Sequence, residues 1–158
     1  MHKWGLVILI VLAGVWILGC KGGVAPPATH HPSQWRGITI YSWDVIREGR
    51  LPPSLAEVPH YEVSEASTRM IASGLQYRHK EPIWKGSCLG VVQLESGGEA
   101  HVAVSLTMGF IQVLDQSGYY VAEGQARKEL DSVMERAYRA FAEQRNEGIG
   151  SLPSQQSP

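Results

Sequence analysis

Residues 88–114 read CLGVVQLESGGEAHVAVSLTMGFIQVL, and apolar runs broken by glycine turns make this stretch typical of β-strands. Residues 88–94 form one run and residues 99–107 alternate between apolar and polar side chains. Gly97 and Gly98 between them supply the backbone freedom that a tight hairpin needs. A further run, 110–114, follows Gly109. Short successive strands joined by tight turns predict an antiparallel meander.

The alternation within residues 99–107 also predicts which side chains are buried. Val102, Val104 and Leu106 are expected to face the core, whereas Ala103 and Ser105, with His101, are expected to face solvent. A strand at Leu75–Lys80 alternates in the same way and ends before Pro82. It brings the predicted meander to four strands.

Helical spacing is found on both sides of these strands. Residues 33–48 predict a first helix, with Ser33 as N-cap, Gly49 as its end, and Trp35, Ile38, Tyr41 and Val45 on one face. Residues 123–147 predict a long amphipathic helix that ends at Gly148, with an apolar stripe of Ala126, Leu130, Val133, Ala137 and Phe141. We expect its first half, 126–133, to pack on the sheet. Its second half, 137–144, is expected to overhang the sheet edge and to be free for a partner.

The predicted fold class is therefore α+β, with an N-terminal helix, a four-stranded antiparallel meander and a long C-terminal helix on one sheet face. The chain has 158 residues, a formal net charge of -1 and 18% charged residues. This balance has no basic excess of the kind that binds nucleic acid. After the two ends are set aside, the length suits one domain.

The N-terminal stretch Lys3–Cys20, KWGLVILIVLAGVWILGC, has the layout of a secretory signal: one cation, an apolar run, then a small residue. Ile17-Leu18-Gly19-Cys20 resembles the lipobox of bacterial lipoproteins. That resemblance implies cleavage before Cys20, its lipidation, and a membrane anchor on the extracytoplasmic side of the cell envelope, periplasmic or at the cell surface. The alternative is an uncleaved membrane anchor, for which the apolar run is slightly short.

These features divide the chain into four parts. Residues 1–20 are a signal sequence or membrane anchor, and residues 21–33 are a Pro/Gly-rich tether. Residues 34–147 form a single α+β domain. Residues 148–158, rich in Ser, Gln and Pro, form a disordered tail.

A second resemblance lies in the loop Gly49–Val58. Gly49, Leu51, Pro52, Ser54, Leu55 and Val58 are similar to a loop of type II secretion pseudopilins, in which a long helix leads into a small antiparallel sheet. The resemblance implies a related domain shape. It implies neither filament assembly nor calcium binding, because the family's N-terminal cleavage motif and late calcium-binding aspartates have no counterpart here.

Candidate chemical groups are few and scattered. His30 and His31 are interpreted as solvated tether, and His60, His79 and His101 have no metal-ligand spacing. Cys88 opens an apolar strand and is expected to be buried, although pairing with His79 or His101 remains an alternative. We predict no catalytic, cofactor or metal site; Cys20 is the one site residue, for lipidation. Among the aromatic residues, Trp35 is expected in the core and Trp84 on the surface.

The sequence thus predicts a non-catalytic, membrane-tethered envelope protein that acts by binding another protein. A pseudopilin-like component of a secretion system is the alternative within that class. A small cysteine- or metal-dependent enzyme is the alternative from another class. The partner, the pathway and the oligomeric state do not follow from the residues.

Overall fold

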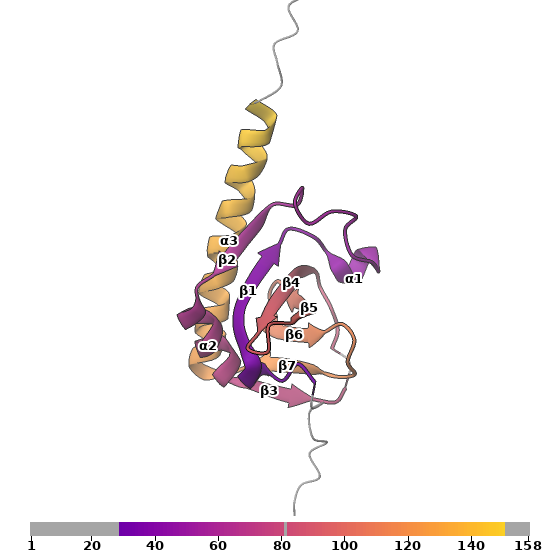
Figure 1. The fold of residues 1–158 in the computed structure, drawn as a ribbon, viewed down its shortest axis with the longest axis vertical. Helices are drawn as coiled ribbons and strands as arrows, with labels where there is room; N and C mark the ends of the chain where they lie inside the picture. Colours follow the sequence, from indigo (N-terminus) through magenta and orange to yellow (C-terminus); the bar gives the residue numbers. More distant parts are fainter. Residues whose placement is uncertain (1–28, 81, 151–158) are drawn as a thin grey trace, which may run out of the picture.

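The computed structural model describes residues 29–80 and 82–150, with side chains up to residue 147. Its centre is one seven-stranded sheet in the order β2-β1-β4-β5-β6-β7-β3, with every neighbouring pair antiparallel (Figure 1). The strands are β1 (Trp35–Tyr41), β2 (His60–Val63), β3 (Leu75–Arg78), β4 (Ser87–Leu94), β5 (Glu99–Ser105), β6 (Phe110–Val113) and β7 (Tyr119–Ala122).

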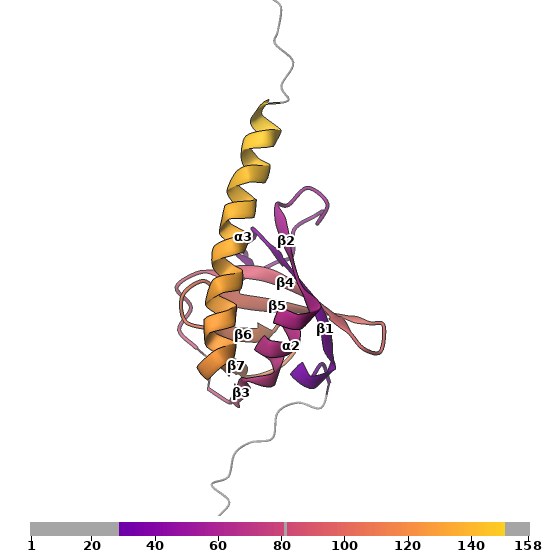
Figure 2. The ribbon, with the colours of Figure 1, turned by 90° about the vertical axis from the view of Figure 1, so that its left-hand side faces the viewer.

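Two helices cover one face of this sheet, which we call the first face (Figure 2). The α+β class is confirmed, because the sheet is antiparallel and the long helix is C-terminal. The largest side chains of the core include Trp35, Ile40, Ile111, Leu130 and Phe141. The helices are η1 (Pro32–Gln34), α1 (Val45–Glu48), α2 (Glu65–Ser73) and α3 (Gly124–Gly150), of which α2 and α3 pack on the first face.

The apolar stripe of α3 is buried along its whole length. Its members from Ala126 to Phe141 lie in the main core, and Phe141 is only 1% exposed. Further along, Gln144 binds the backbone of His60 in the edge strand β2, accepting from its N–H at 2.9 Å and donating to its carbonyl at 2.7 Å. The prediction that residues 137–144 are free for a partner is therefore wrong, because the stripe continues across β2.

The end of α3 also differs from the prediction. The helix passes Gly148 and ends at Gly150, so glycine alone did not stop it. In Figure 1 its last turns extend beyond the sheet, at the end of the molecule opposite to β3. Part of the predicted tail, 151–158, lies outside the described residues.

The predicted first helix over residues 33–48 is wrong. Residues 35–41 form β1; Ser33 and Gln34 belong to the short 3-10 helix η1, and only Val45–Glu48 are α-helical. Apolar side chains at positions 35, 38 and 41 suit a helix, but Ile38-Thr39-Ile40 is a β-branched run that favours a strand. Pairing with both β2 and β4 decides between the two. A register shift between Trp35 and Gly37 turns the Trp35 ring into the core.

The predicted meander is correct in its strands but not in all of its pairings. β4, β5, β6 and β7 follow one another in the sheet, whereas β3 pairs with β7 at the far edge rather than with β4. Residues 119–122, which lie between the last predicted strand and the long helix, form the fourth strand of the meander. β1 and β2 extend the sheet beyond β4, and β3 extends it beyond β7. The sheet therefore has seven strands rather than four.

The second face of the sheet is partly covered, by the segment of residues 42–58 that contains α1. Val45 packs there against Leu89 and Ala103, with Trp43 and Leu55 beside them. Ala103 and Ser105 are consequently buried, and the prediction that they face solvent is wrong. Val102 and Val104 are buried as predicted, and Leu106 is half-buried.

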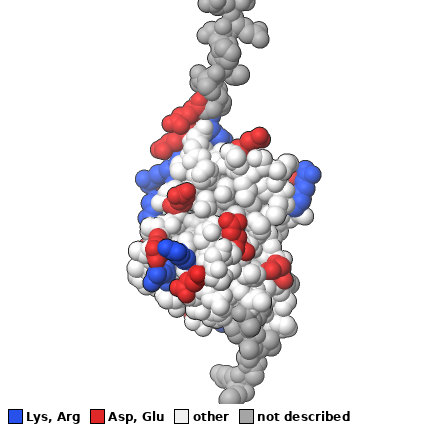
Figure 3. Space-filling view, in the orientation of Figure 1, with Lys and Arg blue, Asp and Glu red and all other residues white. Residues whose placement is uncertain are grey.

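The surface carries charges of both signs. Four ion pairs run along the outer sides of α2 and α3: Arg69–Glu65, Arg127–Asp131, Arg136–Glu129 and Arg139–Glu135. Acidic and basic side chains are interspersed on the face that Figure 3 presents, and a broad area between them is uncharged. Within the described residues, no helix is both long enough and apolar enough to cross a bilayer.

Phe141 tests how far α3 belongs to the core. We expect Phe141→Ala to lower the free energy of unfolding by about 3–5 kcal/mol, because it removes a buried ring and leaves a cavity in the core. The matched control is Glu143→Ala, an exposed position on the same helix, which should change it by less than about 0.5 kcal/mol. Urea denaturation measures both. Equal stability of the two variants would show that the second half of α3 is not part of the core.

Candidate functional site

A carboxylate and a hydroxyl fix α1 against the sheet. Asp44 is the N-cap of α1, and its Oδ1 accepts from the backbone N–H of Arg47 at 3.1 Å. The same oxygen accepts from the Ser87 hydroxyl at 2.7 Å, and Ser87 Oγ in turn accepts from the backbone N–H of Ile46 at 3.2 Å. Because Ser87 is the first residue of β4, these bonds tie α1 to the start of a central strand.

Asp44 is held in its ionised form by this arrangement. Desolvation raises its pKa, but the hydrogen bonds from Ser87 and Arg47 outweigh that effect, and the net result is a pKa below the usual value for aspartate. The chain then leaves α1 through Gly49, which has a φ of 64°. The indole N–H of Trp43 donates to the carbonyl of Arg50 at 3.0 Å and holds the following loop in place.

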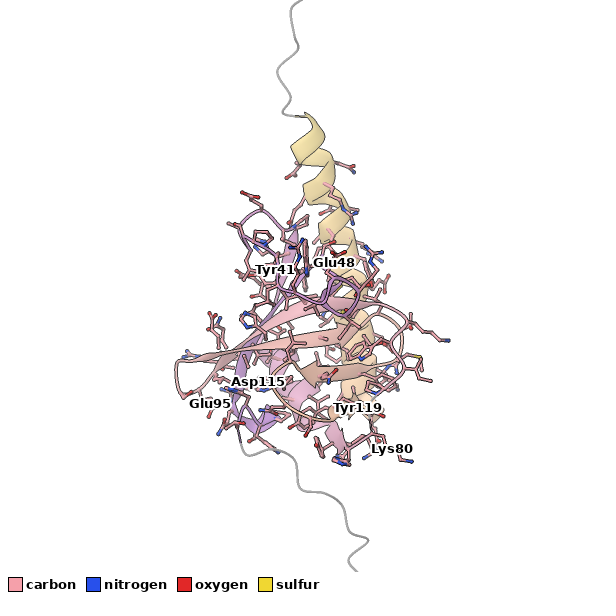
Figure 4. The ribbon with its side chains drawn as sticks, turned by 90° about the vertical axis from the view of Figure 1, so that its right-hand side faces the viewer. Tyr41, Glu48, Lys80, Glu95, Asp115 and Tyr119 are labelled. Carbon is pink, nitrogen blue, oxygen red and sulfur yellow. The ribbon has the colours of Figure 1, made fainter. Side chains whose placement is uncertain are left out.

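A pocket of about 520 Å³ opens between this loop and the sheet, and we call it the second-face pocket. Val45 and Ile46 of α1 form one side, and the opposite side comes from β5 and the end of β6. Leu51 and Leu114 line it from the two sides and remain 42% and 37% exposed. Figure 4 faces this side of the molecule, with Glu48 at the end of α1 and Asp115 across the sheet from it.

Polar side chains, some positively and some negatively charged, complete the lining of the pocket. His30 Nε2 lies 3.4 Å from a carboxylate oxygen of Asp115, and Glu99 accepts from the side chain of Gln93 at 2.8 Å. Arg50 also lines the pocket and has no ion pair among the described residues. His101 lies on the second face, as its alternation predicted. An apolar interior with a few polar groups is the usual character of a binding pocket.

The N-terminal segment enters the fold at the rim of this pocket. Gln116, in the turn after β6, donates to the Thr29 hydroxyl at 3.0 Å and to the Thr29 carbonyl. His30, one residue later, lines the pocket, so the interpretation of His30 as solvated tether is wrong. No local pattern indicated this role, because the partner Asp115 is distant in the sequence.

An aromatic pair continues the exposed surface beyond the pocket. Phe110 of β6 and Tyr119 of β7 lie on the second face in an edge-to-face arrangement, with ring centroids 5.0 Å apart. Both side chains are half-buried. Trp84, predicted to be exposed, instead packs half-buried against the cluster beneath α1, whereas Trp35 is in the core as predicted.

Cys88 does not form a nucleophilic pair with either histidine. It pairs with Val104 in the sheet and faces the first face, whereas His101 faces the second. His79 lies beyond the end of β3, at the edge strand. Cys88 is buried as predicted, and burial, with a smaller contribution from the Asp44 charge, raises the pKa of its thiol to about 11.

The remaining site predictions concern metal binding and lipidation. The described residues contain no cluster of three or more His, Cys, Asp or Glu side chains that is arranged to hold a metal ion. Cys20, the predicted lipidation site, lies outside them. Comparison of the chain with protein-family models, with curated proteins and with solved structures finds no match.

The Asp44 carboxylate predicts a pH dependence of stability. A group whose pKa is lowered by folding stabilises the fold above its unfolded-state pKa of about 4, and this contribution is lost as the pH falls through the folded-state pKa. Asp44→Asn lacks the titrating group, so its unfolding free energy should fall less steeply than that of the wild type from neutral pH into acid. Urea denaturation at several pH values measures the difference. Parallel curves for the two proteins would contradict it.

The raised pKa of Cys88 predicts slow alkylation. At pH 8 the thiolate fraction at a pKa of about 11 is lower than that of a free cysteine by a factor of about 100 or more. Iodoacetamide should therefore modify Cys88 at least about 100-fold more slowly in the folded chain than in urea, because burial also limits access. Peptide mass spectrometry follows Cys88 separately from Cys20. Similar rates in both conditions would show that the thiol is accessible.

Proposed function

We propose that this chain is a non-catalytic protein of the cell envelope, tethered to a membrane by its N-terminal segment on the extracytoplasmic side. It binds a protein partner through the second-face pocket. The observation that carries the proposal is the convergence of two exposed leucines, Leu51 and Leu114, on one pocket of a partly uncovered sheet face. Exposed apolar side chains that gather at one place, with polar groups around them, are typical of protein interaction surfaces.

The surroundings of the pocket favour a protein over a small molecule. The pocket is continuous in the sheet with the face that carries Phe110 and Tyr119, so a partner can bury an aromatic pair as well as the leucines. Arg50, Glu99 and Asp115 provide charges of both signs at the edge, where an interface is usually polar. The α1 segment that supports one side is fixed by Asp44 and is therefore preorganised.

The non-catalytic part of the proposal is supported by the state of Cys88. The thiol is the one candidate nucleophile that the sequence suggested, and its raised pKa keeps it protonated at neutral pH. The membrane tether is supported by the apolar run that ends at Gly19-Cys20. Thr29 enters the fold at the rim of the pocket, so a tethered domain would present this surface close to its membrane attachment.

Site-specific photocrosslinking in the native membrane tests the proposed surface. A photoreactive residue in place of Leu51 or of Leu114 should give one and the same protein adduct, because both positions line one pocket. The control is Met70 on α2, which is 41% exposed on the other side of the sheet and should not give that adduct. The identified partner, once purified, should bind Leu51→Asp at least about 10-fold more weakly than the wild type. Different adducts at Leu51 and Leu114, or the same adduct at Met70, would contradict the proposal.

A further inference from the structure

The two edge strands of the sheet differ in how their outward backbone groups are satisfied. In an antiparallel pair, residues alternate between those that bond to the neighbouring strand and those whose N–H and C=O point away from it. On β2 both outward groups of His60 are bound by the Gln144 side chain of α3. Glu62, the next outward residue by this alternation, carries an exposed carboxylate. The β2 edge is therefore capped against a further strand.

The β3 edge, in contrast, is open. The N–H of Glu123 donates to the carbonyl of Gly74 at 3.2 Å, so even-numbered residues bond to β7 and the odd-numbered Leu75 and Tyr77 point their backbone groups outward. Of these four outward groups, only the Tyr77 carbonyl has a partner among the described residues, the Arg78 guanidinium at 3.1 Å. In Figures 1 and 2, β3 lies at the rim of the domain, and no described element lies beyond it.

We propose that β3 pairs with β3 of a second copy of this chain, antiparallel and about a two-fold axis at Gln76. In this register Leu75 of one copy lies opposite Tyr77 of the other, and the two exchange main-chain hydrogen bonds on both sides of the axis. Both side chains belong to the first face, so they also make an apolar cross-strand contact. Arg78 falls opposite Gly74, so no like charges face each other in the paired strands. The inference goes beyond the proposed function, because β3 does not line the second-face pocket.

A sheet that is open at one edge favours a closed pair of molecules over a longer assembly. If both edges were open, β3 of one copy could pair with β2 of the next, and the sheet would extend without end. Because Gln144 occupies the β2 edge, pairing stops at two copies. Gln76 meets its own equivalent at the axis, where two amide side chains can each donate to the other and accept from it.

The pairing is weak in dilute solution and is favoured by confinement. Two four-residue strands make a small contact, well below the size of a stable protein interface. A membrane tether confines the copies to one surface and raises their effective concentration, and to this extent the inference rests on the proposed function. The Arg78 guanidinium must release the Tyr77 carbonyl, but it keeps its ion pair with Glu123 at 2.8 Å.

Disulfide formation in intact cells that produce the full chain tests the register. After mild oxidation, Gln76→Cys should give a link between position 76 of two copies, because opposite residues of a non-hydrogen-bonded pair have Cα atoms about 4.5 Å apart. One control is Arg78→Cys on the same side of β3, whose equivalents would lie about 14 Å apart along the strands. The other is Glu62→Cys on the capped edge β2. Each control should give at least about tenfold less of its link, and peptide mass spectrometry separates these links from any that involve Cys20 or Cys88.

A charge exchange at the axis tests the pairing without a covalent bond. Gln76→Glu and Gln76→Lys each place like charges opposite each other in a pair of identical copies, so each should weaken association at least about threefold. A mixture of the two variants should restore it, since opposite charges then meet. Energy transfer between labelled full-length copies in phosphatidylcholine vesicles measures the association. Because Gln76 is exposed, both variants should keep the urea midpoint of the wild type, which checks that the fold is intact.

The outcomes separate this pairing from the proposed tether. Equal yields of the link at positions 76, 78 and 62 would overturn the pairing, as would a mixture of the two charge variants that associates no better than either alone. A disulfide from position 76 to a different protein would overturn the second copy as the occupant and assign the β3 edge to a foreign strand. A chain found in the membrane fraction without the link at position 76 overturns the pairing and leaves the tether intact. A chain found only in the soluble fraction overturns the tether, and the yields of the link still decide the pairing.

Discussion

The apolar first face of the sheet must be removed from water, and α3 is the element that does most of this. A fully buried leucine, valine or phenylalanine contributes about 1.5–3 kcal/mol relative to an exposed one, so a stripe of such residues outweighs any single polar contact in the fold. Leu130, Val133 and Phe141 pack on this face, and each is at most 2% exposed to solvent. The length of α3 follows from the same need, because its stripe must reach from the β7 side of the sheet to β2.

The second face of the sheet is also apolar in part, but a smaller area of it is removed from water. A short segment around α1 covers Leu89 and Ala103, and polar bonds from Asp44 and Ser87 hold it there. The cover stops short of Phe110 and Tyr119, and the second-face pocket lies where cover and open sheet meet. A surface that the domain leaves uncovered next to a rigid edge is a natural place for a partner, since binding there costs little further ordering.

Residues for the candidate site come from parts of the chain that are distant in sequence. His30 precedes the first strand, Leu51 follows α1, and Leu114 and Asp115 follow β6. Each looked ordinary alone: a histidine in a tether, leucines beside prolines or turns, an aspartate in a turn. Only the sheet order, which sets the meander beside β1, brings them to one pocket. Cys88, the residue with an evident chemical group, proved to be a buried member of the core.

By itself the sequence determined the local features that depend on periodicity and on turn residues. The strands of the meander, the helix after residue 123, the burial of Cys88 and the inward positions of Val102 and Val104 all follow from spacing along the chain. Tertiary structure decided the rest. Residues 35–41 combined helical spacing with a β-branched run, and strand partners on both sides made them β1. Ala103 and Ser105 were buried because a distant segment covers them, and β3 joined β7 rather than β4. Pairing and cover depend on contacts between residues far apart in sequence, which a local pattern does not contain.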